Sequence, residues 1–223
     1  MPAPVALILG AGANVGQAVA RAFAAKGYKI ALVARSLPKE TSSPADYLHI
    51  RGDLADPSSV AGIFAQVKKE LGLPNVVVYN AAAGRPAADP FAMPLNDFVS
   101  TLHINTTSVY AAAKEAVAAF SETSTPGVFI FTGNITNTKP IPVMAPMSAG
   151  KSATAALIQS AVESAKFPGA RFYYADERKA DGSPAYGAID GEAHAELYTS
   201  LARSSTQGPW LQTFVKGVGY KAF

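Results

Sequence analysis

Short apolar runs alternate with longer segments of helical periodicity along most of the chain. Continuous runs rich in Val, Ile, Leu, Phe and Tyr predict buried strands at residues 5–9, 28–34, 47–51, 75–79, 128–131, 171–175 and 212–216. Alanine-rich segments whose apolar residues recur on one face predict helices at residues 15–26, 56–71, 95–120, 148–167 and 192–203. Strands that alternate with helices are typical of a parallel sheet, so we expect a three-layer α/β/α fold with about seven strands.

The boundaries of these elements are marked by residues that favour turns. Gly27 follows the first helix as a stop, and Pro57 stands near the first position of the second helix. Residues 36–46 are rich in Pro, Ser and Thr and predict a surface loop, while three prolines predict that residues 139–146 are not helical. The sequence contains no internal repeat, low-complexity block or linker, so we expect residues 1–223 to form one domain.

Composition and charge exclude several classes of function. Charged residues make up 16% of the chain, below the ~25% of an average protein, and the net charge of +3 comes from scattered Lys and Arg. We therefore expect neither nucleic-acid nor membrane binding, and a weakly charged surface that fits a homodimer or homotetramer. The chain has no Cys and only three scattered His, so no metal site is expected. The first apolar run is too short for a signal peptide or a membrane span, which favours a cytoplasmic location.

A glycine-rich turn, GAGANVG at residues 10–16, follows the first predicted strand and opens the first predicted helix. Gly10 permits the tight turn, and small residues after it let the backbone approach a pyrophosphate at the positive end of the helix. Gly16 allows that helix to pack closely on the sheet. An ordinary strand–helix turn is the alternative, but this context predicts a Rossmann-type doubly wound fold that binds a dinucleotide.

The end of the second strand indicates which dinucleotide is bound. An acidic residue there bonds the ribose 2′-hydroxyl of NAD, whereas an arginine accommodates the 2′-phosphate of NADP. The strand is followed by Arg35 and Ser36, whose guanidinium and hydroxyl groups both donate hydrogen bonds to phosphate. The sequence therefore predicts NADP(H), with a solvated surface arginine as the alternative. Asp53, with Leu54 beside it, is placed to contact the adenine, although aspartate also forms turns at strand ends.

The landmarks along residues 5–175 resemble those of the short-chain dehydrogenase/reductase family, in the same order. The glycine turn resembles the TGxxxGxG motif, with Asn14 at its middle Gly, and asparagine tolerates left-handed backbone conformations. Asn80 and the alanines after it resemble the NNAG segment, and Asn105 and Lys151 stand where the family keeps a catalytic Asn and the Lys of its YxxxK motif. These features together imply cofactor contacts from Gly10, Gly12, Asn14, Val15, Gly16, Arg35, Ser36, Asp53, Leu54, Asn80, Ala81, Ala82 and Lys151.

Two catalytic positions of that family are changed. Met147 stands at the Tyr of the YxxxK motif, and Asn134 stands at the position of the catalytic Ser. In the family the Tyr donates a proton to a carbonyl oxygen, so its loss removes general acid catalysis worth about 10²–10⁴-fold. The resemblance implies that Asn134 still donates an amide N–H to a substrate oxygen, while Lys151 holds the nicotinamide ribose and Asn105 supports it through water. The alternatives without a role in catalysis are a loop-forming residue for Asn134, a surface residue for Lys151 and an apolar residue at the start of a helix for Met147.

The carboxyl-terminal third departs further from the family. Tyr173, Tyr174 and Tyr186 lie in or near the sixth strand and are candidates for a replacement proton donor, with core packing or surface exposure as the alternative for each. The aromatic, weakly charged segment 208–216 fits either an oligomer surface or a simple edge strand.

Three functions remain open from the sequence. The first is an NADP(H)-dependent oxidoreductase with a degenerate active site, which reduces an activated small apolar substrate such as a conjugated C=C bond or an imine. The second is a catalytically inactive or regulatory NADP(H)-binding protein. The third is a non-redox isomerase or cyclase that uses a hydrophobic pocket lined by Met144 and Met147.

Overall fold

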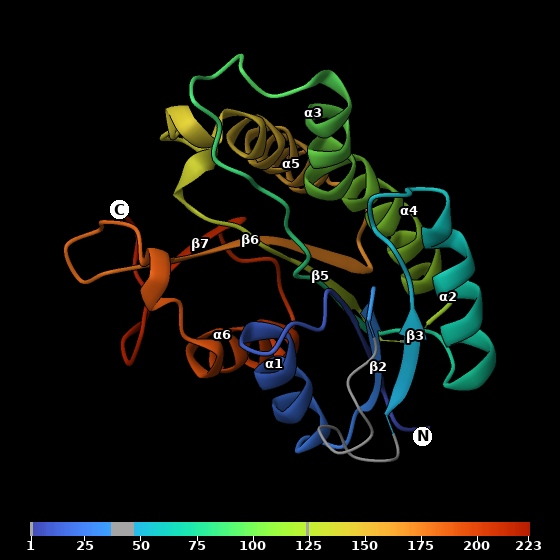
Figure 1. Ribbon diagram of the computed structural model, residues 1–223. Helices are drawn as coiled ribbons and strands as arrows, with labels where there is room; N and C mark the ends of the chain where they lie inside the picture. The colour runs from blue at the N-terminus through green and yellow to red at the C-terminus, as the bar shows by residue number, and fades with distance from the viewer. Residues whose placement is uncertain (1, 37–46, 124) are drawn as a thin grey trace.

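The computed structural model describes residues 2–36, 47–123 and 125–223, which contain one eight-stranded sheet (Figure 1). The strand order is β3-β2-β1-β4-β5-β6-β7-β8, and all neighbours are parallel except β7 and β8. The chain reverses direction across the sheet between β1 and β4, which is the doubly wound arrangement that the sequence predicts. The strands are β1 (Val5–Leu9), β2 (Lys29–Ala34), β3 (Leu48–Arg51), β4 (Val76–Tyr79), β5 (Gly127–Thr132), β6 (Ala170–Arg178), β7 (Leu211–Val215) and β8 (Gly219–Tyr220).

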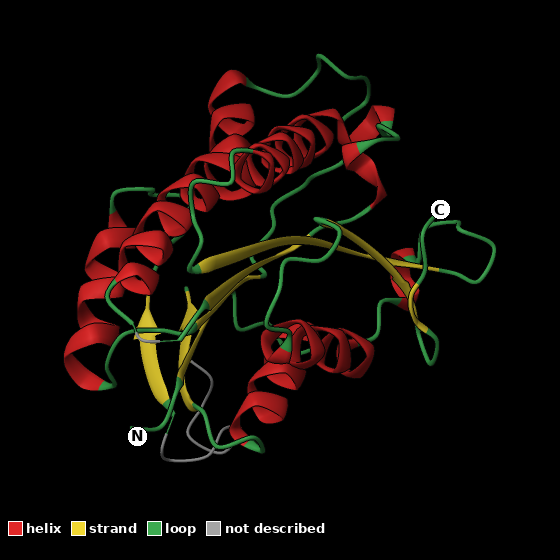
Figure 2. Cartoon of the chain, turned by 180° about the vertical axis from the view of Figure 1, so that it is seen from behind, coloured by secondary structure: helices red, strands yellow, loops and turns green. Residues whose placement is uncertain are grey.

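Helices cover both faces of the sheet and make the predicted three layers (Figure 2). Leu7 and Leu9 of β1 join an apolar cluster with α2, α4 and α5, whereas Ala6 and Ile8 point to the other face and pack with α1 and α6. The helices are α1 (Val15–Ala24), α2 (Ser59–Glu70), α3 (Leu95–Leu102), α4 (Ser108–Ser121), α5 (Ala145–Glu163) and α6 (Gly191–Arg203). The α/β/α prediction is therefore confirmed.

Some boundaries differ from the prediction. Residues 139–146 are not free of helix, because a 3₁₀ turn covers Pro142–Met144 and α5 begins at Ala145. Pro146 is accepted in the first helical turn, where its missing N–H would have no acceptor within the helix. The sixth strand continues three residues beyond its predicted end, to Arg178, and the short strand β8 is absent from the prediction. Most of the predicted loop at residues 36–46 lies outside the described residues.

The predicted helix at residues 95–120 is interrupted by one π-helical turn. α3 is followed by the π turn His103–Thr107, and α4 continues from it. Such turns insert an extra residue into an α-helix and occur frequently at functional sites. Asn105 lies inside this turn and is completely buried.

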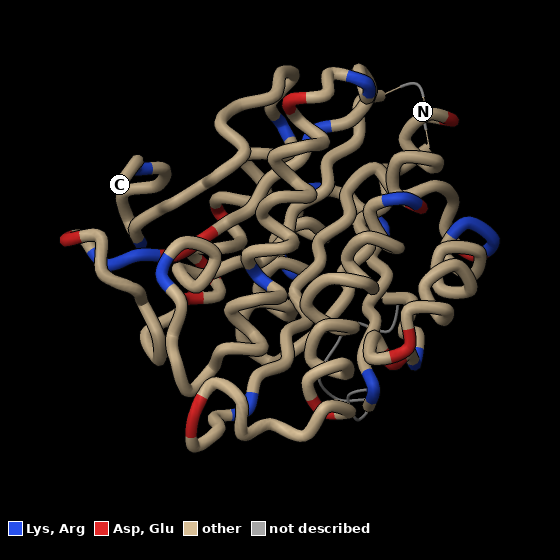
Figure 3. Tube along the Cα trace, turned by 90° about the horizontal axis from the view of Figure 1, so that it is seen from above, with Lys and Arg blue, Asp and Glu red and all other residues tan. Residues whose placement is uncertain are grey.

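Charged residues of both signs are distributed along the chain. Figure 3 shows Lys and Arg interspersed with Asp and Glu on the Cα trace. Within the described part of the chain, none of the helices has the length and apolar character needed to cross a membrane.

Candidate functional site

A cleft of about 1120 Å³ lies at the carboxyl ends of β1, β2 and β4. This is where the strand order reverses, and ligands of doubly wound folds bind at that point. Most of the predicted cofactor contacts line it, namely Gly10, Gly12, Arg35, Ser36, Asp53, Leu54, Asn80, Ala81 and Ala82. The structure therefore brings together, around one cavity, residues that are far apart in the sequence.

Gly10 is in close contact with the backbone of the segment that follows β4. Its backbone has φ +103°, and a Cβ atom there would lie 2.4 Å from the backbone nitrogen of Ala81. Asn80 Nδ2 donates a hydrogen bond to Gly10 O at 2.8 Å. A Cβ atom at Gly16 would lie 2.7 Å from the same carbonyl oxygen, so α1 starts in contact with the turn. Both glycines are thus required by close backbone contacts.

Gly12 differs from its neighbours in the turn, because no atom lies within 4 Å of where its Cβ would be. Gly12 also lines the cleft, so its backbone is accessible from the cavity. The first turn of α1 begins beside it at Val15, and the first N–H groups of a helix lack partners within the helix. A backbone cradle of this kind is suited to an anionic group.

Asn14 faces away from the cavity and does not line it. Its φ is −86°, so the left-handed conformation considered for Asn14 is not adopted. Its Nδ2 donates to Ile189 O at 2.9 Å, and Gly191 packs against it so closely that a Cβ there would lie 2.6 Å from Asn14 Oδ1. Val15 and Gly16 are buried on the sheet side of α1. Asn14, Val15 and Gly16 therefore support the glycine turn from the side that faces away from the cleft.

The far end of the cleft carries the polar groups that follow β2 and β3. Arg35 and Ser36 are exposed at its rim. Asp53 Oδ1 accepts a hydrogen bond from the Ala55 N–H at 3.0 Å, and the carbonyl oxygen of Leu54 accepts one from Ser108 Oγ at 2.7 Å. The loop after β3 is thereby fixed to α4, while the arginine and serine side chains remain accessible.

Asn105 connects the π turn to the loop after β4. Its Nδ2 donates to Ala83 O at 2.6 Å and to Thr101 O at 2.9 Å, and its own backbone oxygen accepts a hydrogen bond from Thr154 Oγ1 on α5. Asn105 Oδ1 is buried and has no hydrogen-bond partner among the described residues. This acceptor is the one group of Asn105 still available for a water or a proton relay.

Apolar methionine side chains lie where the resemblance places a tyrosine hydroxyl. Met147 lies on the first turns of α5, and its Sδ is 2.9 Å from where a Cβ on Gly84 would be. Met144 Cε approaches the same point to 2.7 Å, so the two methionines pack together over Gly84. Gly84 lines the cleft, and the methionine pair packs behind it without lining the cleft itself.

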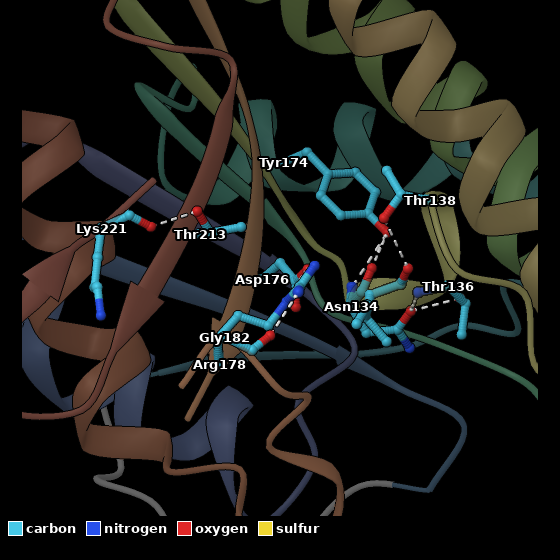
Figure 4. Close-up of polar contacts among 10 residues, drawn as sticks. Asn134, Thr136, Thr138, Tyr174, Asp176, Arg178, Gly182, Thr213 and Lys221 are labelled. Atoms are coloured by element: carbon cyan, nitrogen blue, oxygen red, sulfur yellow. Dashed lines mark hydrogen bonds and ion pairs between the residues drawn. The ribbon is translucent and has the colours of Figure 1, made fainter. Parts of the chain in front are cut away.

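Asn134 is held by hydrogen bonds at the end of β5 (Figure 4). Its Oδ1 accepts from Thr136 N at 3.0 Å and from Thr136 Oγ1 at 2.6 Å. Its backbone N–H donates to the Tyr174 hydroxyl at 3.1 Å, and that hydroxyl donates to Asn134 O at 2.8 Å. Because the carboxamide oxygen is occupied, the NH₂ group is the part of this side chain that is left to meet a ligand.

Tyr173 and Tyr174 are fully buried, which favours core packing over proton transfer for both. Burial raises the pKa of the Tyr174 hydroxyl well above its usual value. Tyr186 is 60% exposed and has a φ of +47°. Of the three candidate tyrosines, only Tyr186 has a side chain that solvent can reach.

Lys151 points into the protein rather than into the cleft. It is 2% exposed, its Nζ donates to Thr132 O at 2.7 Å, and the ammonium lies 4.2 Å from the centre of the Phe131 ring. Burial lowers the pKa of Lys151 to about 7, and the carboxylate of Asp176 opposes this effect. Lys151 is not among the residues that line the cleft, so its predicted contact with a ribose requires a change of side-chain position.

A family model described as short chain dehydrogenase matches residues 4–168. The chain belongs to the short-chain dehydrogenase family. A short-chain dehydrogenase/reductase, dmxR12, of Cryptosporiopsis sp. (strain 8999) is 45% identical over 239 residues, covering 100% of this chain and 96% of the relative. A 3-beta-hydroxysteroid dehydrogenase of Comamonas testosteroni is 30% identical over 171 residues, covering 74% of this chain and 65% of the relative.

Solved structures with the same fold include other short-chain dehydrogenases. A metagenomic short-chain oxidoreductase in complex with NADP superposes with a TM-score of 0.81 at 21% identity, covering 96% of this chain and 97% of that one. A 3-ketoacyl-(acyl-carrier-protein) reductase from Brucella melitensis, complexed with NADH, gives a TM-score of 0.83 at 19% identity, covering 97% and 98% of the two chains. At these identities the likeness shows the fold.

The sequence-based prediction for this short-chain dehydrogenase missed Asp176 and Arg178. Both are buried on the extended part of β6 and are joined by an ion pair of 2.5 Å. The segment after residue 175 is polar and lies outside the predicted strand, because buried charges carry no apolar signal. Only the two-residue spacing, which places both side chains on one face of a strand, hints at the pair.

Proposed function

We propose that this short-chain dehydrogenase binds NADP(H) in the cleft over β1, β2 and β4. The observation that carries the proposal is the contrast within the glycine turn, where Gly10 is packed under Ala81 while Gly12 opens its backbone to the cavity. A pyrophosphate fits this cradle because the amino end of α1 offers partial positive charge. The NADP complex of the metagenomic neighbour supports this interpretation.

Different residues of the cleft would hold different parts of the dinucleotide. Arg35 and Ser36 would hold the 2′-phosphate, since both are accessible donors beside the end of β2. Asp53 and Leu54 would contact the adenine. The loop from Asn80 to Ala82 would border the ribose and nicotinamide. Lys151 of α5 and Asn105 of the π turn would support the same half of the dinucleotide.

We infer further that the active site is degenerate and serves an activated substrate. Bound NADPH supplies a hydride. Met147, together with Met144, would exclude water and contact apolar parts of the substrate, but it has no proton to donate. The NH₂ group of Asn134 would donate a hydrogen bond to a substrate oxygen or nitrogen. A conjugated C=C bond or an imine suits this set of groups, because its electrophilic carbon would accept the hydride with little help from an acid and the proton that completes the reduction would then be taken up from solvent.

Met147→Tyr is expected to create carbonyl reductase activity or to raise it by about 10²-fold or more, because a phenol would supply the missing proton. The measurement is NADPH oxidation with a panel of ketones, enones and imines. Met144→Tyr is the matched control, since Met144 also packs on Gly84 but is not the motif position. Inactivity of the wild type on the whole panel, with no gain in Met147→Tyr, would contradict the oxidoreductase proposal.

A second function is favoured by the position of Lys151. Its ammonium is buried against Thr132 and Phe131, which suits a protein that binds NADP(H) without turning it over. Calorimetry and turnover assays on the same preparation separate the two functions, because the non-catalytic protein would show NADPH binding and no product with any member of the panel.

We also propose that the chain forms a homodimer, or a homotetramer built from such dimers, through the outer surface of α4 and α5. An apolar groove of about 460 Å³ runs between these helices. Tyr110 and Leu157 line it and are 57% and 38% exposed, which is unusual for large apolar side chains on a monomer surface. The carboxyl-terminal segment considered earlier is less suited, because β8 covers the outer edge of β7.

Tyr110→Glu is expected to weaken self-association about 100-fold or more, because it would bury an unpaired carboxylate against apolar side chains. Light scattering over a concentration series measures the change. Lys26→Glu, at an exposed residue of the turn after α1 on the opposite side of the sheet, is the control and should keep the wild-type mass. A wild-type chain that is monomeric at all concentrations would contradict the dimer.

A further inference from the structure

The carboxyl end of β6 carries three consecutive charged residues that are all buried. Asp176, Glu177 and Arg178 are 1%, 7% and 9% exposed. Side chains alternate along the strand, since Tyr174 belongs to the apolar cluster under α4 and α5 while Ala175 belongs to the cluster under α1 and α6. Asp176 therefore points toward the α5 face, which is also the face from which Lys151 enters.

Glu177 points the other way and has its own partners. Its Oε2 accepts a hydrogen bond from the Asp190 N–H at 2.8 Å and lies 3.5 Å from His194 Nδ1 on α6. Glu177 is thereby engaged at the amino end of α6, and it is Asp176 that is left to act on the α5 side.

Asp176 is only half satisfied by Arg178 (Figure 4). Its Oδ2 accepts from Arg178 Nε at 2.7 Å and from Arg178 Nη2 at 2.5 Å. Arg178 Nη1 donates in turn to Gly182 O at 3.0 Å, which fixes the guanidinium. Asp176 Oδ1 is buried and has no hydrogen-bond partner among the described residues. A buried carboxylate with a free oxygen is costly unless a nearby positive charge stabilises it.

Lys151 supplies a positive charge on the same face. Its Nζ is bonded to the carbonyl oxygen of Thr132, and Thr132 is the β5 residue that pairs with Ala175, directly before Asp176. Burial raises the pKa of the Asp176 carboxyl above its usual value, while Arg178 and the Lys151 ammonium oppose that rise, and the Asp176 carboxylate in turn opposes the fall that burial causes in the pKa of Lys151. The groups that face this pair in the described structure are Arg178 and Tyr174 of β6 and the ring of Phe131 on β5.

We propose that Asp176 is a positioning residue for Lys151, whose buried side chain it keeps in the ammonium form at the end of β5. The inference rests on the proposed function, because the ammonium would serve the nicotinamide half of NADP(H). The negative charge that supports the lysine comes from β6, whose Asp176 lies on the same face of the sheet. An uncharged amine would lose both the favourable contact with the Phe131 ring and the donor strength toward Thr132.

The sign of the expected pH effect follows from the charge that is removed. Burial already brings the pKa of Lys151 down to about 7 in the presence of Asp176. Asp176→Asn deletes the group that raises this pKa, so Lys151 should lose its proton at a lower pH. Opposite charges near one another shift a pKa by about one to three units, and because the direct ion pair of Asp176 is with Arg178, we expect the low end of that range, a fall of about one pH unit.

The direct test is the titration of Lys151 by NMR of the full chain labelled with ¹³C at lysine Cε, with the signal assigned by its loss in Lys151→Met. Asp176→Asn should lower the midpoint by about one unit. Asp181→Asn, an exposed aspartate of the next loop, is the matched control and should leave it unchanged. Equal midpoints in the wild type and in folded Asp176→Asn would overturn the proposal.

The reciprocal measurement covers the case in which Asp176→Asn does not fold. Lys151→Met replaces the ammonium with an apolar group of similar length, which the surroundings of Phe131 favour. Coupling between two sites is mutual, so the Asp176 carboxyl, followed by its ¹³Cγ shift, should titrate at a higher pH in Lys151→Met than in the wild type. An unchanged Asp176 titration would also overturn the proposal.

The effect of Asp176→Asn on cofactor binding is measured as the affinity for NADPH at two pH values. Near pH 7 a smaller fraction of Lys151 would be charged in Asp176→Asn than in the wild type, so NADPH binding should weaken by a few fold there and little at pH 5. A uniform loss at both pH values would show a merely structural role. If the wild type does not bind NADPH at all, the proposed function fails, while the lysine titration still decides the role of Asp176.

Discussion

Replacing Gly10 with alanine is expected to destabilise the chain by about 3 kcal/mol and to abolish NADPH binding. The new Cβ would lie 2.4 Å from the backbone nitrogen of Ala81, and the φ of +103° is unfavourable for any residue with a side chain. The chain after β4 would have to move, and with it the hydrogen bond from Asn80. For a protein of this length the thermal midpoint should fall by about 6–12 °C, which calorimetry measures directly.

Gly12→Ala is the matched control for this effect. No atom lies within 4 Å of the new methyl group, so the free protein should unfold at the wild-type temperature. The same methyl group would occupy the cleft where the pyrophosphate is proposed to lie, and NADPH binding should weaken strongly. Full NADPH affinity in Gly12→Ala would show that the cradle is not the phosphate site, even if Gly10→Ala behaves as expected.

Arg35→Ala is expected to weaken NADPH binding about 100-fold and to leave NADH binding within about twofold. The guanidinium would lose charge-assisted hydrogen bonds to the 2′-phosphate, worth roughly 1.5–3 kcal/mol each, and NADH has no such phosphate. Titration calorimetry with both cofactors measures the two affinities at one salt concentration.

Arg51→Ala provides the control for charge alone. Arg51 is exposed on β3, opposite Ala34 at the end of β2, and it does not line the cleft. It should change the affinity for NADPH by only a few fold, through long-range electrostatics. An equal loss of NADPH and NADH affinity in Arg35→Ala would argue against a 2′-phosphate contact at this residue.

Most of the sheet could be predicted because its strands are continuous apolar runs. β1 and β4 are buried on both faces, as parallel strands between two helical layers must be, and their boundaries agree with the pattern to within one residue. The carboxyl end of β6 could not be predicted in this way. Its hydrogen-bonding partner is β7, and its charges are buried only because Arg178 and Lys151 face Asp176.

The candidate site was predictable where backbone geometry decides it. The spacing of Gly10, Gly12 and Gly16 between a strand and a helix encodes the cradle, and the cleft forms at that turn. The direction of side chains could be predicted less well from the sequence. A motif position places Lys151 on the correct turn of α5, but whether its ammonium points to the cleft or to Thr132 depends on groups contributed by β5 and β6. The π turn likewise depends on packing around Asn105.

The contact between Asn14 and the amino end of α6 limits how segments can be exchanged among relatives. The family match stops at residue 168, yet the back of the glycine turn rests on Ile189 and Gly191. A chimaera that grafts the carboxyl-terminal third of another short-chain dehydrogenase onto this chain must therefore keep a glycine at position 191. Otherwise the graft would displace the phosphate cradle from a distance, although it replaces none of the cradle's own residues.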